Sequence, residues 1–166
     1  MPDTALMREL EFTLDDLSAN RTGKLSEMQL DRLRLRRQRS ILTGTGIVVA
    51  LAFAASLCLF GGLRGSAILT VIGLGLTVCA TVVMSTFARY WLRLSADIRE
   101  GTTSIFSGPL ERVVKPVNRR IVTYLLRVGG AEFSVTKDVF KLFDHEKKYA
   151  LYRAKFSGLL LSAERV

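Results

Sequence analysis

The sequence has few of the residues from which catalytic and metal sites are usually built. It contains one histidine, His145, and two cysteines. His145 lies in the charged stretch DHEKK, with no cysteine or metal-ligand spacing nearby. None of the common nucleotide-binding, serine-hydrolase or zinc-protease motifs occurs. We therefore predict that the chain is not an enzyme and uses no metal or other cofactor.

Charged side chains are almost missing from the middle of the chain. Between Ile41 and Ala88 the only one is Arg64, which separates two apolar runs, 41–63 and 67–88. At ~1.5 Å per residue, a helix of about 22 residues is about 33 Å long and can cross the ~30 Å hydrocarbon core of a bilayer. The sequence therefore predicts an integral membrane protein with two transmembrane helices, joined by a tight turn at 64–66.

The two runs also lack the ionisable residues that usually mark an ion or proton path. We therefore expect an anchor rather than a transporter. Cys58 and Cys79 lie at depths that differ by roughly 15 Å, so a disulfide within one hairpin is excluded. We interpret both as small packing residues.

Small residues recur at intervals of four along the first run and again along the second. Such faces let helix backbones approach closely. The residues that we predict to pack in this way are Gly46, Ala50, Ala54, Cys58, Gly75 and Cys79. Two interpretations stay open: packing of the two helices against each other, and self-association of hairpins into a homo-oligomer.

Basic residues flank the hairpin on the side of both chain termini, whereas the turn has only one. Because cytoplasmic loops are enriched in Lys and Arg, we predict that both termini are cytoplasmic, at a plasma or inner membrane. Aromatic residues after the second span are typical of an interface belt. The predicted membrane-interface residues are Arg32, Arg34, Arg36, Arg37, Arg39, Arg64, Arg89, Tyr90, Trp91 and Arg93.

Residues 1–40 form a charged leader that we predict to be a cytoplasmic helix-turn-helix. Its first helix is expected over 4–17, where one apolar stripe consists of Leu6, Leu10, Leu14 and Leu17. Its second helix begins at the capping box SEMQ, 26–29, and continues into the first span. The loop at 18–29 has the outline of an EF-hand but lacks its carboxylates, so Gly23 is expected only to end the first helix.

After a helical neck over 89–100, the pattern of residues 101–166 changes to that of short strands. Strands are predicted at 102–108, 110–116, 119–128, 131–135, 148–154 and 158–164, with a short helix at 136–143. The predicted fold class is an α+β membrane protein. Its C-terminal domain is expected to be a small OB-like or SH3-like β-barrel with one short helix.

The formal net charge is +9, and most of the positive excess lies in residues 89–166. A basic domain beside a membrane typically faces anionic headgroups, and a basic OB face with exposed aromatics can bind nucleic acid. We expect most aromatic rings to fill the core, with Tyr152 and Phe156 the most exposed. The candidate binding surface consists of Arg119, Arg120, Lys147, Lys148, Tyr152, Arg153, Lys155 and Phe156.

Two segments carry a resemblance: DLSANRTGKLSEMQ before the spans, and FSVTKDVFKLFDHEKKYALYRAKFSGLLLSAE after them. They resemble a group of two-span membrane proteins of uncharacterised function that have a small C-terminal β-domain. The architecture is also similar in outline to NfeD-type membrane proteins. The resemblance implies a fold and no activity.

The function predicted from these features is that of a membrane-anchored binding or scaffold protein, which displays a basic β-domain at the cytoplasmic membrane surface. Its expected partners are the bilayer, anionic headgroups and an unidentified protein. Two alternatives stay open. One is a membrane tether for nucleic acid, and the other is an accessory subunit of a larger transport or signalling complex.

Overall fold

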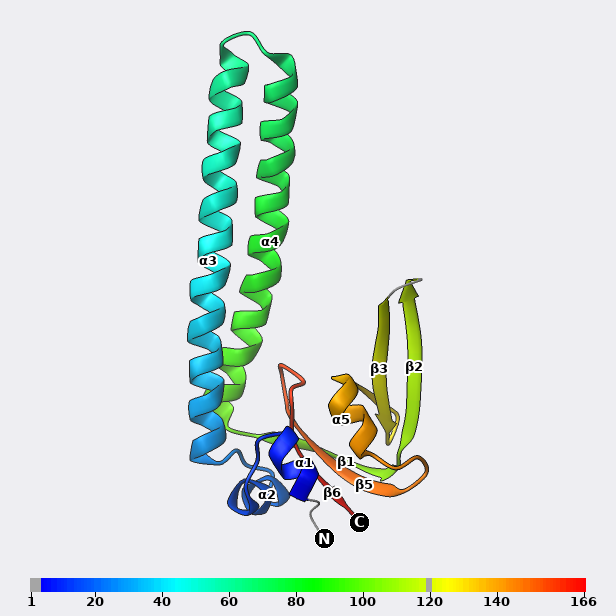
Figure 1. Ribbon diagram of the computed structural model, residues 1–166. Coiled ribbons are helices and arrows are strands. Elements are labelled where there is room, and N and C mark those ends of the chain that lie inside the picture. Colours follow the sequence, from blue (N-terminus) through cyan, green and yellow to red (C-terminus); the bar gives the residue numbers. More distant parts are fainter. Residues whose placement is uncertain (1–3, 119–120) are drawn as a thin grey trace. The chain divides into compact units, whose positions relative to one another are not determined.

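The computed structural model describes residues 4–118 and 121–166 (Figure 1). Its elements in chain order are α1 (Thr4–Glu9), α2 (Leu14–Arg21), α3 (Glu27–Leu63), α4 (Ala67–Glu100), β1 (Thr103–Pro109), β2 (Glu111–Asn118), β3 (Ile121–Val128), β4 (Ala131–Val135), α5 (Lys137–Leu142), β5 (Lys148–Ala154) and β6 (Leu160–Arg165). They form two compact units. One consists of Met1–Leu30 and Glu100–Val166, and is called the β-unit here. The other, Asp31–Arg99, is called the hairpin unit.

The hairpin unit consists of two long helices joined by a short turn. The 37 residues of α3 run without a break from the leader through the first apolar run, and the 34 residues of α4 include the predicted neck. Both helices are long and apolar enough to cross a membrane. Gly65, at φ 109°, turns the chain between them, because this conformation is open to glycine and costly for other residues.

The leader has two short helices where one was predicted, so the expected helix over 4–17 is wrong. Thr13 begins α2 with a capping box. Its side chain accepts a hydrogen bond from the backbone N–H of Asp16, and its own N–H donates to the Asp16 carboxylate at 2.9 Å. Glu11, at φ 54°, breaks the helix before that point. A Thr-x-x-Asp sequence is a helix-start signal, and here it outweighs the leucine spacing.

The second capping box is confirmed. The backbone N–H of Ser26 donates to Gln29 Oε1 at 3.3 Å, and the N–H of Gln29 donates to Ser26 Oγ at 3.1 Å. This pair fixes the start of α3. Gly23, at φ 78°, follows the end of α2 as predicted.

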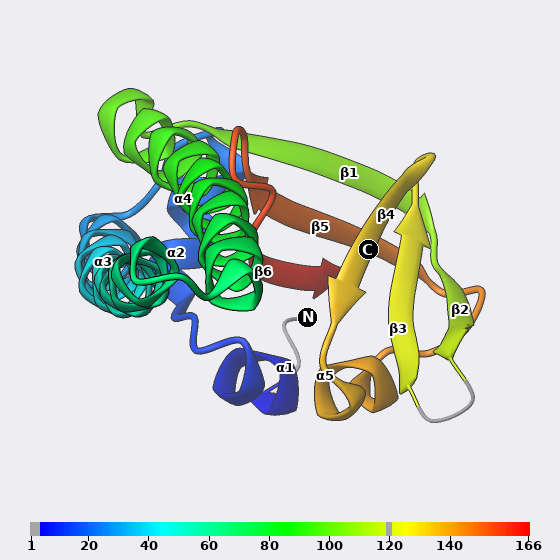
Figure 2. The same cartoon turned by 90° about the horizontal axis from the view of Figure 1, so that it is seen from above.

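The β-unit contains two three-stranded antiparallel sheets, in the orders β1-β5-β6 and β2-β3-β4 (Figure 2). All six predicted strands and the short helix are confirmed within a few residues. Leu110 alone separates β1 from β2, so the chain passes directly from one sheet to the other. Gly129 and Gly130, at φ 56° and 78°, make the predicted turn between β3 and β4, as expected for a two-residue hairpin loop.

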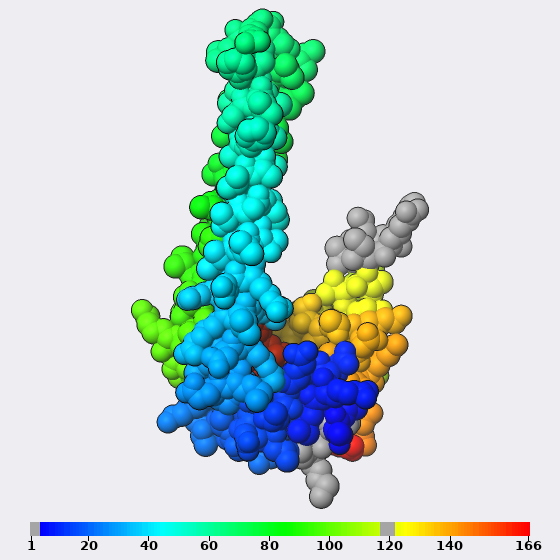
Figure 3. Space-filling model, turned by 60° about the vertical axis from the view of Figure 1, so that its left-hand side comes forward, coloured from blue at the N-terminus to red at the C-terminus, as the bar shows by residue number. Residues whose placement is uncertain are grey.

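One hydrophobic core joins the two sheets, α5 and the leader. Phe106 of β1 contacts Phe133 of β4, with ring centroids 5.5 Å apart. Leu6, Phe12 and Leu17 from the leader are buried in the same cluster. In Figure 3 the blue leader and the orange segment around α5 form one continuous surface. The leader is therefore part of the β-unit core, although composition alone separates residues 1–40 from 101–166.

Candidate functional site

The hairpin unit exposes large apolar side chains along both helices. Leu42 is 77% exposed and Ile68 is 74% exposed. Only 6% of the most apolar window of each helix is buried. A soluble protein rarely leaves so much contiguous apolar surface in water. This exposure fits the prediction of two membrane spans, and insertion into a bilayer stays a prediction.

Glycines on the facing sides of α3 and α4 let the helices approach. A Cβ at Gly73 would lie 2.7 Å from Leu59 Cγ and 3.0 Å from the Leu59 backbone nitrogen. A Cβ at Gly44 would lie 2.9 Å from the Trp91 ring. Both glycines are buried, and Ala55 beside them is 4% exposed. The close contact within the hairpin therefore depends on glycines outside the predicted set.

The six predicted packing residues lie mainly away from that contact. At Gly46 and Gly75 an added Cβ would meet nothing within 4 Å. Ala50 and Cys79 are exposed, and Ala54 and Cys58 are half-buried. Both cysteines are free. Of the two interpretations of this stripe, self-association of hairpins is the one that its exposure favours, and it stays a prediction.

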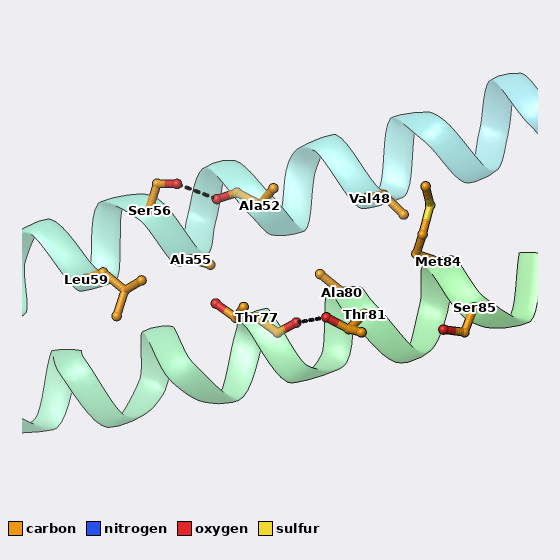
Figure 4. Close-up of a pocket in the computed structure, with 10 residues that line it drawn as sticks. All are labelled: Val48, Ala52, Ala55, Ser56, Leu59, Thr77, Ala80, Thr81, Met84 and Ser85. Atoms are coloured by element: carbon orange, nitrogen blue, oxygen red, sulfur yellow. Dashed lines mark hydrogen bonds between the residues drawn. The ribbon is translucent and has the colours of Figure 1, made fainter. Parts of the chain in front are cut away.

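A shallow groove of about 420 Å³ runs between the two helices, next to the contact (Figure 4). Most of its lining residues have short side chains, among them Ala52, Ala80 and Ser56, and the larger Leu59 and Met84 also line it. Ser56 Oγ donates to the carbonyl of Ala52 at 2.8 Å, and Thr81 Oγ1 donates to the carbonyl of Thr77 at 3.0 Å. Because these hydroxyls bond within their own helices, the lining of the groove is mostly apolar.

Polar contacts join the two helices near their charged ends. Arg37 Nη1 donates to Ser95 Oγ at 3.3 Å, and Trp91 Nε1 donates to Ser40 Oγ at 3.2 Å. Asp97, in the same unit, is fully buried. Its burial was not predicted, because nothing in the sequence around it indicates a buried carboxylate.

The other predicted interface residues are spread over exposed parts of this unit. Arg34 pairs with Asp31 at 2.7 Å, and the Arg64 guanidinium lies 4.6 Å from the Phe60 ring centre. The remaining exposed arginines are Arg36, Arg39, Arg89 and Arg93, whereas Arg32 and Tyr90 are half-buried.

A polar cluster joins α2 to the β1-β5-β6 sheet, on the sheet face that carries Tyr152 and Ser162. Asn20 Nδ2 donates to Ser162 Oγ at 2.6 Å, and both residues are fully buried. Arg21 forms an ion pair with Glu164, and the Tyr152 hydroxyl donates to Glu164 Oε1 at 2.6 Å. We call these five residues the α2–β6 latch. No local sequence signal marks it, because Asn20 and Ser162 are 142 residues apart.

The latch corrects the expectation for Tyr152, which is 3% exposed and not a surface ring. Residues 150, 152 and 154 lie on the sheet face that α2 covers. Burial, followed by the hydrogen bond to Glu164, raises the pKa of Tyr152 to about 12. The hydrogen bond from Arg21 is the main cause that lowers the pKa of Glu164. In this cluster the Glu164 carboxylate accepts a hydrogen bond from the Tyr152 hydroxyl and forms an ion pair with Arg21. Its role is structural.

Replacing Glu164 by glutamine should reduce the acid sensitivity of the β-unit. The lowered pKa of Glu164 means that its stabilisation is complete above the unfolded-state pKa of about 4.3 and is lost as the pH falls through the folded-state pKa. We expect E164Q to cost about 1 kcal/mol at pH 7 and less at pH 3, which is below the unfolded-state pKa. Hydrogen exchange of β6 amides against urea, in the full chain in detergent, measures this difference.

The matched control is Glu9→Gln, which removes an exposed carboxylate at the end of α1. Its stability difference from the native protein should not change between the two pH values. An E164Q difference that is equal at pH 7 and pH 3 would contradict the role of the ion pair.

The predicted binding surface does not form a single patch. Lys147 and Lys148 are exposed at the start of β5, whereas Lys155 and Phe156 lie beyond its other end. At ~3.3 Å per residue, Lys148 and Lys155 are about 23 Å apart along the strand. Lys155 pairs with Glu100 at 3.2 Å and lies over the Phe156 ring. Phe156, expected to be exposed, is half-buried.

The remaining predicted surface residues differ in accessibility. The half-buried Arg153 stacks on the Phe106 ring, with 4.6 Å from the guanidinium carbon to the ring centre. Arg119 and Arg120 lie outside the described residues. The expectation that most aromatic rings of residues 101–166 fill the core is confirmed. Five of these eight rings are buried: Phe133, Phe140, Phe143, Tyr149 and Tyr152.

Within residues 4–118 and 121–166, no group of three or more His, Cys, Asp or Glu side chains could hold a metal ion. Comparison with known proteins found no match among family models, curated proteins or solved structures.

Proposed function

We propose that this protein is a membrane-anchored binding or scaffold module. Its hairpin crosses the bilayer twice, and its basic C-terminal β-domain, residues 101–166, acts at the cytoplasmic membrane surface. The observation that carries the proposal is the exposure of the apolar side chains on both long helices, among them Leu42, Val49, Phe53, Leu57, Ile68, Val71, Val78 and Val82.

A bilayer is the surrounding that best fits this exposure. Apart from the groups at its two ends, a helix bonds its backbone polar groups internally, as the hydrocarbon core requires. The only charged residue between Ile41 and Ala88 is Arg64, at the turn, where its long side chain can reach an interface. The arginines before and after the hairpin support a cytoplasmic location for both chain termini.

The β-unit supports binding of headgroups or a protein better than binding of nucleic acid. Base stacking needs exposed aromatic faces, and five of the rings are in the core. Closure of the two sheets into an OB-like or SH3-like barrel, and kinship with the two-span proteins named above, belong to the same proposal. The rival functions are a nucleic-acid tether and an accessory subunit. Each would require its own binding surface, and no group of the described residues indicates one.

Cysteine accessibility in intact cells tests the topology. In a full-length variant with Cys58→Ala and Cys79→Ala, a single cysteine is placed at Arg64 in the turn or at Asp138 on α5. We expect a membrane-impermeant maleimide to label the turn cysteine from outside, and the α5 cysteine only after lysis. The two positions are matched because both side chains are exposed. Labelling of Asp138→Cys in intact cells would overturn the proposed orientation.

A further inference from the structure

The β2–β3 hairpin has two faces of opposite character. In the strand register Val114 pairs with Tyr124, and Pro116 pairs with Val122. Side chains alternate across a strand, so these four residues share the face that continues the core. The other face carries the ion pairs of Arg127 with Glu111, Arg127 with Glu132 and Lys115 with Glu132. Between these charges lies one apolar pair, Val113 and the buried Leu125.

The apolar face is covered at its inner end and bare at its outer end. Phe140 of α5 packs on Tyr124, with ring centroids 5.1 Å apart. Val114, the strand partner of Tyr124, is 51% exposed beside that contact. Beyond it, Val122 is 44% exposed and Pro116 is exposed. In Figure 1 the outer parts of β2 and β3 extend past α5. The strands are therefore longer than the core that they cover.

The charge of this segment complements an anionic surface. Between Glu111 and Glu132 the sequence has no acidic residue and five basic ones: Arg112, Lys115, Arg119, Arg120 and Arg127. The two flanking glutamates pair with Lys115 and Arg127, so the sequence of this segment keeps a positive excess. Apolar side chains next to basic ones are the usual composition of elements that lie in a membrane interface.

We propose that the outer apolar face of the β2–β3 hairpin inserts into the headgroup region of an anionic bilayer. The inference rests on the proposed function, because the two spans keep the β-unit close to a membrane and raise the local lipid concentration. It goes further in naming the contact surface: Val114, Pro116 and Val122.

A lipid surface fits this hairpin better than a protein strand does. The outermost strand, β2, contains a proline, which has no backbone N–H to donate, and its register shifts between Pro116 and Asn118. Both features discourage another chain from pairing with the sheet edge. Neither feature affects insertion of the apolar side chains into lipid.

The test uses the full chain without its native cysteines, reconstituted in nanodiscs of neutral or anionic phospholipid. An environment-sensitive dye is attached to a single cysteine at Val122. We expect its emission to shift to shorter wavelength, and to be quenched by spin-labelled lipid, in anionic nanodiscs and less in neutral ones. High salt should reduce the shift, because screening weakens the attraction to headgroups. The same response is expected at Val114→Cys, on the neighbouring strand.

The adjacent residue is the matched control. Thr123 lies on the opposite face and pairs with Lys115, so a dye at Thr123→Cys should stay in water. Hydrogen exchange of β5 in each labelled protein verifies that the β-unit is folded. Equal emission at residues 122 and 123 in anionic nanodiscs would overturn the inference, and so would a response at 122 that does not depend on anionic lipid.

A dye at Val71→Cys, within the predicted second span, separates this inference from the proposed function. Lipid quenching at residue 71 together with a water-exposed dye at residue 122 would refute the hairpin contact and leave the membrane anchor intact. A water-exposed dye at both positions would refute the anchor itself.

Discussion

The free energy of unfolding of the β-unit should fall by about 2–5 kcal/mol when Leu17 is replaced by alanine. Leu17 is 2% exposed and lies in the core cluster with Leu6 and Phe12 from the leader and Leu151 from β5. Truncating it removes apolar contacts and leaves a cavity in that core. The measurement is hydrogen exchange of the β5 amides against urea, in the full chain in detergent.

Leu14→Ala is the matched control for this change. It is the same substitution in the same helix, but Leu14 is 59% exposed, so we expect a change within about 0.5 kcal/mol. The comparison also distinguishes the structure from the leucine stripe expected over 4–17, in which both leucines belong to one buried face. Equal losses for the two variants would support the stripe and contradict the packing of the leader.

A loss of β5 stability in Leu17→Ala would mean that residues 101–166 do not form a complete core without the leader. Residues 101–166 look like an independent domain by composition, yet Leu6, Phe12 and Leu17 complete their core. A fragment that starts at residue 101 would expose the sheet face that α2 covers. Binding studies therefore need the full chain.

Features that depend on local sequence were predicted well. The capping box at Ser26 and the Gly129–Gly130 turn are each specified by neighbouring residues, and the structure has both. The long helices follow from unbroken apolar composition. In each case the interacting groups lie within a few residues, so the pattern itself contains the physical cause.

Features that depend on contacts between distant segments were not predicted. Strand β5 lies between β1 and β6 in the sheet, but nothing in its residues identifies these neighbours. Tyr152 was expected at the surface because it is near a turn, and it is buried because α2 covers that face. The bond between Asn20 and Ser162 joins opposite ends of the chain. Composition indicates that such residues can be buried, but not which segment buries them.

The spacing of small residues likewise failed to predict which helix faces pack together within the hairpin. The four-residue repeat through Gly46 and Ala50 identifies one face of a helix correctly, but does not identify its neighbour. The neighbouring helix instead meets the face that contains Gly44 and Ala55. Since a helix has several faces with short side chains, the choice depends on the partner's large residues, such as Trp91 and Phe87.

Replacing Gly73 by alanine should destabilise the pairing of α3 and α4 by about 1–3 kcal/mol, as overpacking does in a tightly packed contact. The new Cβ would lie 2.7 Å from Leu59 Cγ and 3.0 Å from its backbone nitrogen. The Leu59 side chain can rotate away, but the backbone can give only if the helices separate. The fluorescence of Trp91, the single tryptophan, reports this separation because its indole donates to Ser40 across the hairpin.

Gly75→Ala is the control that makes the result specific to the contact. It lies two residues along the same helix and meets nothing within 4 Å, and both substitutions raise helix propensity equally, by up to about 1 kcal/mol. In a titration of detergent-solubilised protein with dodecyl sulfate, Gly73→Ala should lower the midpoint, and Gly75→Ala should leave it unchanged or raise it. The reverse order would mean that the face with Gly46 and Gly75, rather than the face with Gly44 and Gly73, holds the two helices together.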